Sequence, residues 1–175
     1  AEIESKSVTA EAIAPATYTG ASIPSMISGK YASTHGCWNF SDRLASQPEL
    51  LSVPHSYRAP TIWTHLDESE KPPIRETKAD SSRTIDDLAT EEGEFVYIEH
   101  DKGGHSPYGC SFEEHSTPSY FDAVDDTDTI PADYESSIDA SAARFEKLVE
   151  TLRNRNILDE TLVIFTSDHG EILGG

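Results

Sequence analysis

Residues 138–171 constrain the fold most, because a helix-like pattern, a short turn and a strand-like run follow one another there. Apolar side chains recur at spacings of four and three, as one face of an amphipathic helix requires: Ile138, Ala142, Phe145, Val149 and Leu152, with Leu148 beside them. Residues 161–166 are nearly all apolar, which is typical of a strand buried on both faces of a parallel sheet. A helix that leads into such a strand predicts an α/β fold.

Two further elements are predicted upstream. Residues 94–99 are β-branched and aromatic, and they indicate a strand that breaks into the glycine-rich residues 102–105. Residues 25–28 indicate a short helix that ends at Gly29.

Two polar stretches carry few periodic apolar positions. Residues 37–92 hold several prolines and many charges, and we expect a long surface excursion with one short helix. Residues 109–133 are expected to form a second polar loop.

The charge of the chain limits its partners. Its 175 residues include 32 acidic and 13 basic side chains, for a net charge of −19. Such a surface repels the nucleic-acid backbone and anionic membranes. The acidic residues are spread along the chain, which favours adaptation to high salt, where screening relieves self-repulsion.

No segment is long and apolar enough for a membrane span, and the acidic residues 1–4 do not resemble a signal peptide. We expect a soluble protein, with a cytoplasmic location favoured; any leader would precede residue 1. Cys37 and Cys110 do not have metal-binding spacing, and the oligomeric state is not indicated.

Polar side chains follow both predicted strands, at the sheet edge where α/β proteins place their sites. Asp168 and His169 come directly after residues 161–166, and both are preferred ligands of divalent cations. A capped turn with an exposed histidine is the more common meaning of such a pair alone.

His105 follows the other strand, in the turn formed by residues 105–108. A histidine held by a proline-containing turn can contact an anionic substrate or act as a general acid. A loop histidine packed on Tyr108 fits the spacing equally well. We expect His100 and His115 to be solvated.

Thr19 and Ser22 lie where a loop enters the first helix. Backbone N–H groups and the positive end of the helix dipole make this a favourable place for a tetrahedral oxyanion. An ordinary hydroxyl N-cap is the alternative.

The three segments occur in the order of a known family. Residues 14–36, with Gly29-Lys30-Tyr31 and then His35-Gly36, resemble the nucleophile region of the sulfatases, within the alkaline-phosphatase superfamily. Residues 105–108 resemble the family's His-x-Pro-Tyr turn. Residues 158–171 are very similar to its strand and metal-ligand segment, which is the most specific of the three.

The resemblance implies a three-layer α/β sandwich with a mostly parallel central sheet, of which residues 1–175 are a partial catalytic domain, incomplete at both ends. It implies a metal-dependent hydrolase of sulfate or phosphate esters, with a small-molecule, glycan or lipid ester as substrate. Asp168 and His169 correspond to ligands of a divalent cation: calcium by family, with magnesium, manganese or zinc as alternatives. His105 corresponds to a histidine that contacts the transferred group or assists the leaving group.

Two registers are open for the nucleophile. Thr19 lies ten residues before Gly29, as in the family, whereas Ser22 imitates the local Cys/Ser-x-Pro-Ser core but lies seven before it. We favour Thr19, because a deletion of three residues within one helix would rotate everything after it. Neither residue meets the formylglycine maturation signal, so the resemblance implies an unmodified hydroxyl, as in phosphoryl- and phosphoethanolamine-transferring relatives.

The family's pattern also leaves the activity open. A transferase, a phosphodiesterase or an inactive anion-binding relative would carry the same motifs. Two ligands are too few for a catalytic cation, which takes roughly four to six, and only 18 residues precede Thr19, where the family has an acidic pair further upstream. We therefore expect residues 1–175 to be inactive alone.

Overall fold

The computed structural model describes residues 7–46, 48–51, 55–58, 84–88, 93–101, 103–109, 114, 116–124 and 127–173. The α-helices are α1 (Thr19–Ser28), α2 (Ala32–His35), α3 (Ile85–Leu88), α4 (Thr117–Ala123) and α5 (Ile130–Asn154). The strands are β1 (His55–Arg58) and β2 (Phe95–Ile98), and short 3-10 turns occupy Glu49–Leu51, Thr127–Thr129 and Leu158–Glu160.

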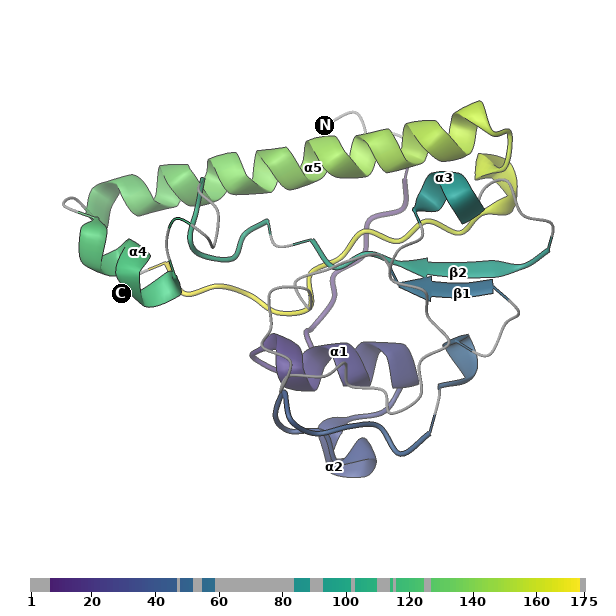
Figure 1. The fold of residues 1–175 in the computed structure, drawn as a ribbon, viewed down its shortest axis with the longest axis horizontal. Helices are drawn as coiled ribbons and strands as arrows, with labels where there is room; N and C mark the ends of the chain where they lie inside the picture. The colour runs from purple at the N-terminus through teal and green to yellow at the C-terminus, as the bar shows by residue number, and fades with distance from the viewer. Residues whose placement is uncertain are drawn as a thin grey trace.

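The strands β1 and β2 form a parallel pair, with His55 opposite Phe95 and Arg58 opposite Ile98. In Figure 1, α5 lies on one side of this pair and α1 and α2 lie on the other. Helices on both sides of parallel strands confirm the predicted α/β class. β2 also confirms the strand predicted at residues 94–99. β1 was not predicted, because its polar sequence His-Ser-Tyr-Arg lacks an apolar pattern.

The helix α1 begins six residues earlier than the short helix predicted at 25–28. It ends as predicted, at Gly29, whose φ of 66° is the left-handed conformation that glycine adopts readily. Its first residues are small and buried. A Cβ atom on Gly20 would lie 2.8 Å from the Tyr18 ring, so a larger residue there would separate the helix from the preceding chain.

The helix α5 confirms the predicted amphipathic helix and extends it to 25 residues. Pro131 in its first turn has no N–H to lose and favours a start there. The prediction of a loop at residues 109–133 is partly wrong, because α4 and the start of α5 lie in this range. Ser116 caps the N-terminus of α4, where its side chain accepts from the Ser119 N–H.

The buried strand predicted at residues 161–166 is wrong for this structure. The strands in the described residues, β1 and β2, pair with each other, and residues 161–166 form no strand. Its apolar side chains stay in contact with water: Leu162 is 85% exposed and Ile164 is 71% exposed. Phe165 finds one partner on α5, Phe145, with ring centroids 4.6 Å apart.

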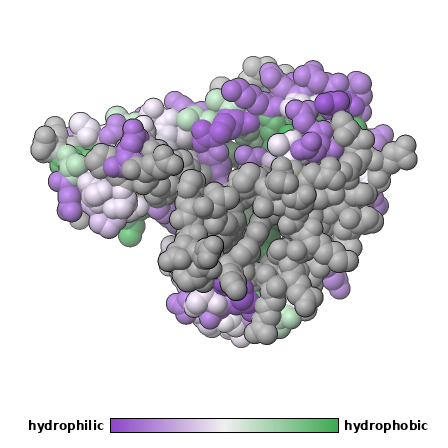
Figure 2. All heavy atoms as spheres, in the orientation of Figure 1, coloured by the Kyte–Doolittle hydropathy of each residue, from purple (hydrophilic) through white to green (hydrophobic). Residues whose placement is uncertain are grey.

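Two small apolar clusters hold the rest together. One joins α1 to β2 and contains Ile27, Cys37 and Leu44, packed against Ile23, Val96 and Ile98. The other joins the turn at 105–108 to α4 and α5 through Tyr108, Tyr120 and Ile130. The coloured part of the surface in Figure 2 is mainly hydrophilic. No helix in the described ranges is both long and apolar enough to cross a bilayer.

Candidate active site

One pocket collects the predicted site residues. The first residue of α1, the loop after β2, the first half of α5 and residues 167–171 line it. Thr19, His105, Asp168 and His169 all belong to this lining, although Thr19 and His169 are 150 residues apart in sequence. Ser22, the alternative nucleophile, is outside the lining.

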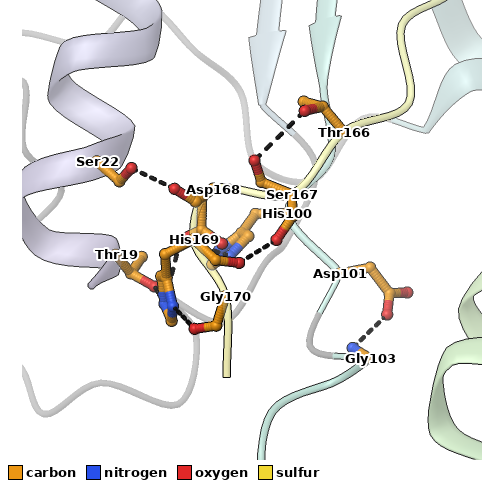
Figure 3. Close-up of polar contacts among 10 residues, drawn as sticks. All are labelled: Thr19, Ser22, His100, Asp101, Gly103, Thr166, Ser167, Asp168, His169 and Gly170. Carbon is orange, nitrogen blue, oxygen red and sulfur yellow. Dashed lines mark hydrogen bonds and ion pairs between the residues drawn. The ribbon is translucent and has the colours of Figure 1, made fainter. Parts of the chain in front are cut away.

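Thr19 and His169 face each other directly, with Thr19 Oγ1 3.2 Å from His169 Nε2 (Figure 3). The other ring nitrogen of His169, Nδ1, lies 2.6 Å from the Gly170 carbonyl oxygen. Because a carbonyl can only accept, Nδ1 carries the hydrogen of the neutral ring. Nε2 then presents its lone pair toward the Thr19 hydroxyl, the arrangement needed either to accept a proton or to bind a cation.

Ser22 has a different environment from Thr19, one helical turn earlier. Its side chain is fully buried, and its hydroxyl donates to the backbone carbonyl of Asp168 (Figure 3). This bond fixes the segment that carries Asp168 and His169 against α1. The hydroxyl of Ser22 is thus used in holding the backbone.

The Asp168 carboxylate is the chemically unusual group of the pocket. Its Oδ2 atom is buried and accepts no hydrogen bond from the residues that the structure describes. Two imidazole nitrogens, His100 Nε2 and His169 Nε2, each lie 3.7 Å from it. A buried carboxylate oxygen without a hydrogen bond is unfavourable unless positive charge compensates it.

These donors fit part of a divalent cation site. The Asp168 carboxylate and the His169 ring line the same pocket, and both groups suit such ions. Within the described ranges, however, no group of three or more histidine, cysteine, aspartate or glutamate side chains is arranged to hold a metal. Asp168 and His169 therefore provide some of the ligands that a cation would need, and not the whole set.

His100 was expected to be solvated, and that expectation is wrong. Its side chain is only 15% exposed and lies beside Asp168. Burial lowers the pKa of His100, although the neighbouring Asp168 carboxylate opposes the shift. Its position two residues beyond the end of β2 was the available signal, because α/β sites lie at the carboxyl ends of strands. His115 lies outside the described residues.

His105 also has a fixed tautomer. Its Nδ1 lies 2.5 Å from the carbonyl oxygen of Ser106, so the hydrogen of the neutral ring is on Nδ1 and the lone pair is on Nε2. The turn that carries it is held by Tyr108, which is 3% exposed and packs edge-on against Tyr120 and Tyr134. The Tyr108 hydroxyl donates to the Glu171 carboxylate over 3.2 Å.

A second hydroxyl–histidine pair, Ser25 and His35, is not part of the pocket lining, and its hydrogen bond runs in the wrong direction for catalysis. His35 Nδ1 accepts from the Cys37 N–H at 3.0 Å, so Nε2 carries the hydrogen and donates to Ser25 Oγ at 2.9 Å. Ser25 donates in turn to the Ala21 carbonyl. Burial and the Lys30 charge lower the pKa of His35 and thus favour this neutral form. The pair joins α2 to α1 and does not activate a nucleophile.

Comparison with known proteins agrees with the motifs of the pocket. The sequence profile of the Sulfatase family matches residues 70–175, a range that contains His105, Asp168 and His169 and begins within the 37–92 stretch. Thr19 and Ser22 lie outside that range. No solved structure matches the chain.

A curated relative covers nearly the whole chain. Over 176 aligned residues, the chain is 39% identical to the low-salt glycan biosynthesis sulfotransferase Agl7 of the halophile Haloferax volcanii. The alignment covers 98% of this chain and 43% of the relative, so the chain spans less than half of the relative's length. Since the family match covers more than half of the chain and includes two of its three motifs, the chain belongs to the sulfatase family.

Proposed function

We propose that this chain supplies part of the active site of a metal-dependent enzyme that transfers the sulfuryl or phosphoryl group of an ester through Thr19. The observation that carries the proposal is the 3.2 Å approach of Thr19 Oγ1 to His169 Nε2, beside the buried Asp168 carboxylate. It favours Thr19 over Ser22, because only Thr19 lines the pocket.

Asp168 and His169 would hold a divalent cation, calcium by family, together with water, substrate oxygens or residues outside the described ranges. The cation would lower the pKa of the Thr19 hydroxyl and neutralise charge on the transferred group. His169 suits this role because its Nδ1 is bonded to a backbone carbonyl, which orients Nε2 in the manner of many metal-binding histidines.

The reaction then has two balanced steps. Thr19 loses its proton to solvent, and Oγ1 bonds to sulfur or phosphorus while the bond to the ester oxygen breaks. His105, with both ring nitrogens protonated at the start of the cycle, donates the proton on Nε2 to the departing alcohol and becomes neutral. In the second step a hydroxyl attacks the group on Thr19 and gives its proton to His105, and Thr19 leaves as an alkoxide that regains a proton from solvent.

The acceptor decides the name of the activity. Water as acceptor gives an ester hydrolase, and a sugar hydroxyl gives a sulfotransferase. The 39% identity to a protein named as a glycan biosynthesis sulfotransferase favours a sugar hydroxyl and a sulfate group. The proposal also concerns the fold. In the whole protein, residues 161–166 join a larger parallel sheet within a three-layer sandwich.

The test uses the whole protein in high salt, with calcium, magnesium, manganese or zinc. The probes are p-nitrophenyl sulfate, p-nitrophenyl phosphate and bis-p-nitrophenyl phosphate, each with and without a methyl glycoside as acceptor. We expect cation-dependent release of p-nitrophenol, faster with the glycoside. Thr19→Ala should abolish release.

The matched control is Ser22→Ala, on the same helix face, which should retain turnover at a lower level because it loses only the bond to the Asp168 backbone. Turnover that survives Thr19→Ala would reject the nucleophile. No turnover of any probe with any cation would favour an inactive anion-binding relative.

A further inference from the structure

The carboxylate of Asp101 bonds the loop after β2 to α5. Its oxygens accept hydrogen bonds from the Gly103 N–H at 2.7 Å (Figure 3), from Ser141 Oγ at 2.6 Å, and from both Nε and Nη2 of Arg144. Four donors on one side chain fix its position, and two of the three residues that provide them are on α5.

The backbone of this loop also lies directly on the helix. A Cβ atom on Gly103 would fall 1.7 Å from Ser141 Oγ, so only glycine allows this approach. The Gly104 N–H donates to Ser137 Oγ at 3.2 Å. Ser137, Ser141 and Arg144 are spaced by four and three residues, which places them on one face of α5 as a polar stripe that receives the loop.

Three histidines line the pocket, and two of them lie in this loop. His100 precedes Asp101 directly, and His105 follows Gly104 directly. The hydrogen bonds of the Asp101 carboxylate go to Gly103 and to α5, whereas the substrate-facing groups of the proposed reaction are Thr19, His105, Asp168 and His169. Asp101 itself lines the pocket, and its charge acts directly on the neighbouring His100. Its effect on the position of His105 passes through the loop backbone.

We infer that Asp101 and Arg144 are a positioning pair, which fixes His100 and His105 in the pocket by anchoring their loop to α5. The inference rests on the proposed function, because it gives that reaction two residues that act through its histidines. A carboxylate is required: an asparagine would present an N–H toward Arg144 Nε and would lose that bond.

The ionisation of Asp101 agrees with this role. Partial burial acts to raise its pKa, but the hydrogen bonds from Arg144, Ser141 and the Gly103 N–H outweigh burial and lower the pKa to about 2. The pair is thus charged at any pH at which the enzyme would work.

The chain offers a matched control on the same helix. Arg155 pairs with Asp86 over 3.2 Å, which joins α3 to α5, and neither residue lines the pocket. An Asp86→Asn variant removes one carboxylate that is bonded to the arginine at the C-terminal cap of α5, whereas Asp101→Asn removes one bonded to an arginine within α5, and Asp86→Asn leaves the loop untouched.

The experiment compares Asp101→Asn, Arg144→Ala, Arg144→Lys and Asp86→Asn in the whole protein. The first readout is kcat and KM for p-nitrophenyl sulfate. The second is the nuclear magnetic resonance spectrum of histidine side chains labelled with carbon-13, which reports the surroundings of His100 and His105 without any turnover.

We expect Asp101→Asn and Arg144→Ala to lower kcat by about tenfold to a hundredfold, with KM changed less than about twofold, as small misplacements of reacting groups do. Arg144→Lys should recover part of the loss, and Asp86→Asn should leave kcat and KM unchanged. The His100 and His105 signals should shift in Asp101→Asn and Arg144→Ala, and not in Asp86→Asn.

Unmoved His100 and His105 signals in a folded Asp101→Asn variant would overturn the inference, whatever the activity. If the wild-type protein turns over no probe, the proposed function fails while the spectra still decide the positioning. If Asp101→Asn does not fold, Ser141→Ala serves instead, because it removes one donor and keeps a good helix former. Its His100 and His105 signals should shift in the same sense, and unmoved signals would overturn the inference.

Discussion

The hydroxyl of Tyr108 donates to the carboxylate of Glu171 over 3.2 Å, and it thereby joins the turn of His105 to the segment of Asp168 and His169. Tyr108 is 3% exposed, so its hydroxyl has little access to water as an alternative partner. The two segments are 63 residues apart in sequence. This partly buried hydrogen bond and the aromatic packing around Tyr108 thus contribute to the relative position of the two segments in the pocket.

Replacing Tyr108 by phenylalanine should lower the free energy of unfolding by about 1–3 kcal/mol, because a hydrogen bond to a charged group is lost while the ring packing remains. Guanidinium chloride unfolding measures this. Tyr97→Phe is the control. Tyr97 donates to Glu99, two residues along the same segment, in an exposed hydrogen bond. The loss of that bond should change the free energy of unfolding by less than about 0.5 kcal/mol. Equal effects of the two substitutions would contradict a bridging role for Tyr108.

Replacing Asp168 by asparagine should weaken the binding of manganese by at least about tenfold, because a neutral amide replaces the buried carboxylate that attracts the cation. Electron paramagnetic resonance of free manganese in titrations of the whole protein gives the dissociation constant. Asp159→Asn, in an exposed turn before residues 161–166, removes the same charge away from the pocket and should leave affinity unchanged. An affinity that Asp168→Asn leaves intact would place the cation elsewhere.

The Asp101 pair predicts a specific loss of stability in acid. Since the pKa of Asp101 falls from the ordinary 3.8 to about 2 on folding, its contribution is complete above pH 4 and disappears as pH falls through 2. Arg144 is 46% exposed and solvent screens the pair, so we expect a contribution of about 1 kcal/mol. Wild type should exceed Asp101→Asn by this amount at pH 5 in urea unfolding, and the difference should vanish near pH 2. A difference that stays constant between these pH values would contradict the ionic origin.

High salt should stabilise the chain. A net charge of −19 produces self-repulsion, and raising the ionic strength from 0.1 M to 1 M shortens the screening length from about 10 Å to about 3 Å. We expect the melting temperature to rise between 0.1 M and 2 M potassium chloride, as measured by circular dichroism. The sign of the change is decisive: a melting temperature that stays level or falls would reject the salt-adaptation hypothesis.

Local patterns predicted the elements that depend on local sequence. The spacing of Phe145, Val149 and Leu152 indicated α5, and the composition around Val96 indicated β2. The same reasoning failed at residues 161–166, because an apolar run shows what a segment tends to bury and not which strand pairs with it. It missed β1 and α4, whose sequences lack periodic apolar positions.

The pocket could be predicted where a family motif marked a residue. Thr19, His105, Asp168 and His169 came from motifs, and the structure brings them into one pocket. His100 has no motif, and it enters the pocket only because of where β2 ends. The bonds from Asp101 to Ser141 and Arg144 span 40 and 43 residues. Nothing in a local pattern connects such distant polar side chains.

The exposed run at residues 161–166 has a consequence for the behaviour of residues 1–175 in solution when they are produced alone. Unpaired backbone with apolar side chains is a template on which a second chain can add a strand. Two exposed acidic residues, Asp159 and Glu160, directly precede it, and they act as gatekeepers through their like charge. Salt therefore acts on this chain in two opposite ways. The ions relieve electrostatic repulsion within one molecule, and they also remove the electrostatic repulsion that keeps two molecules apart. Self-association should then begin at this run.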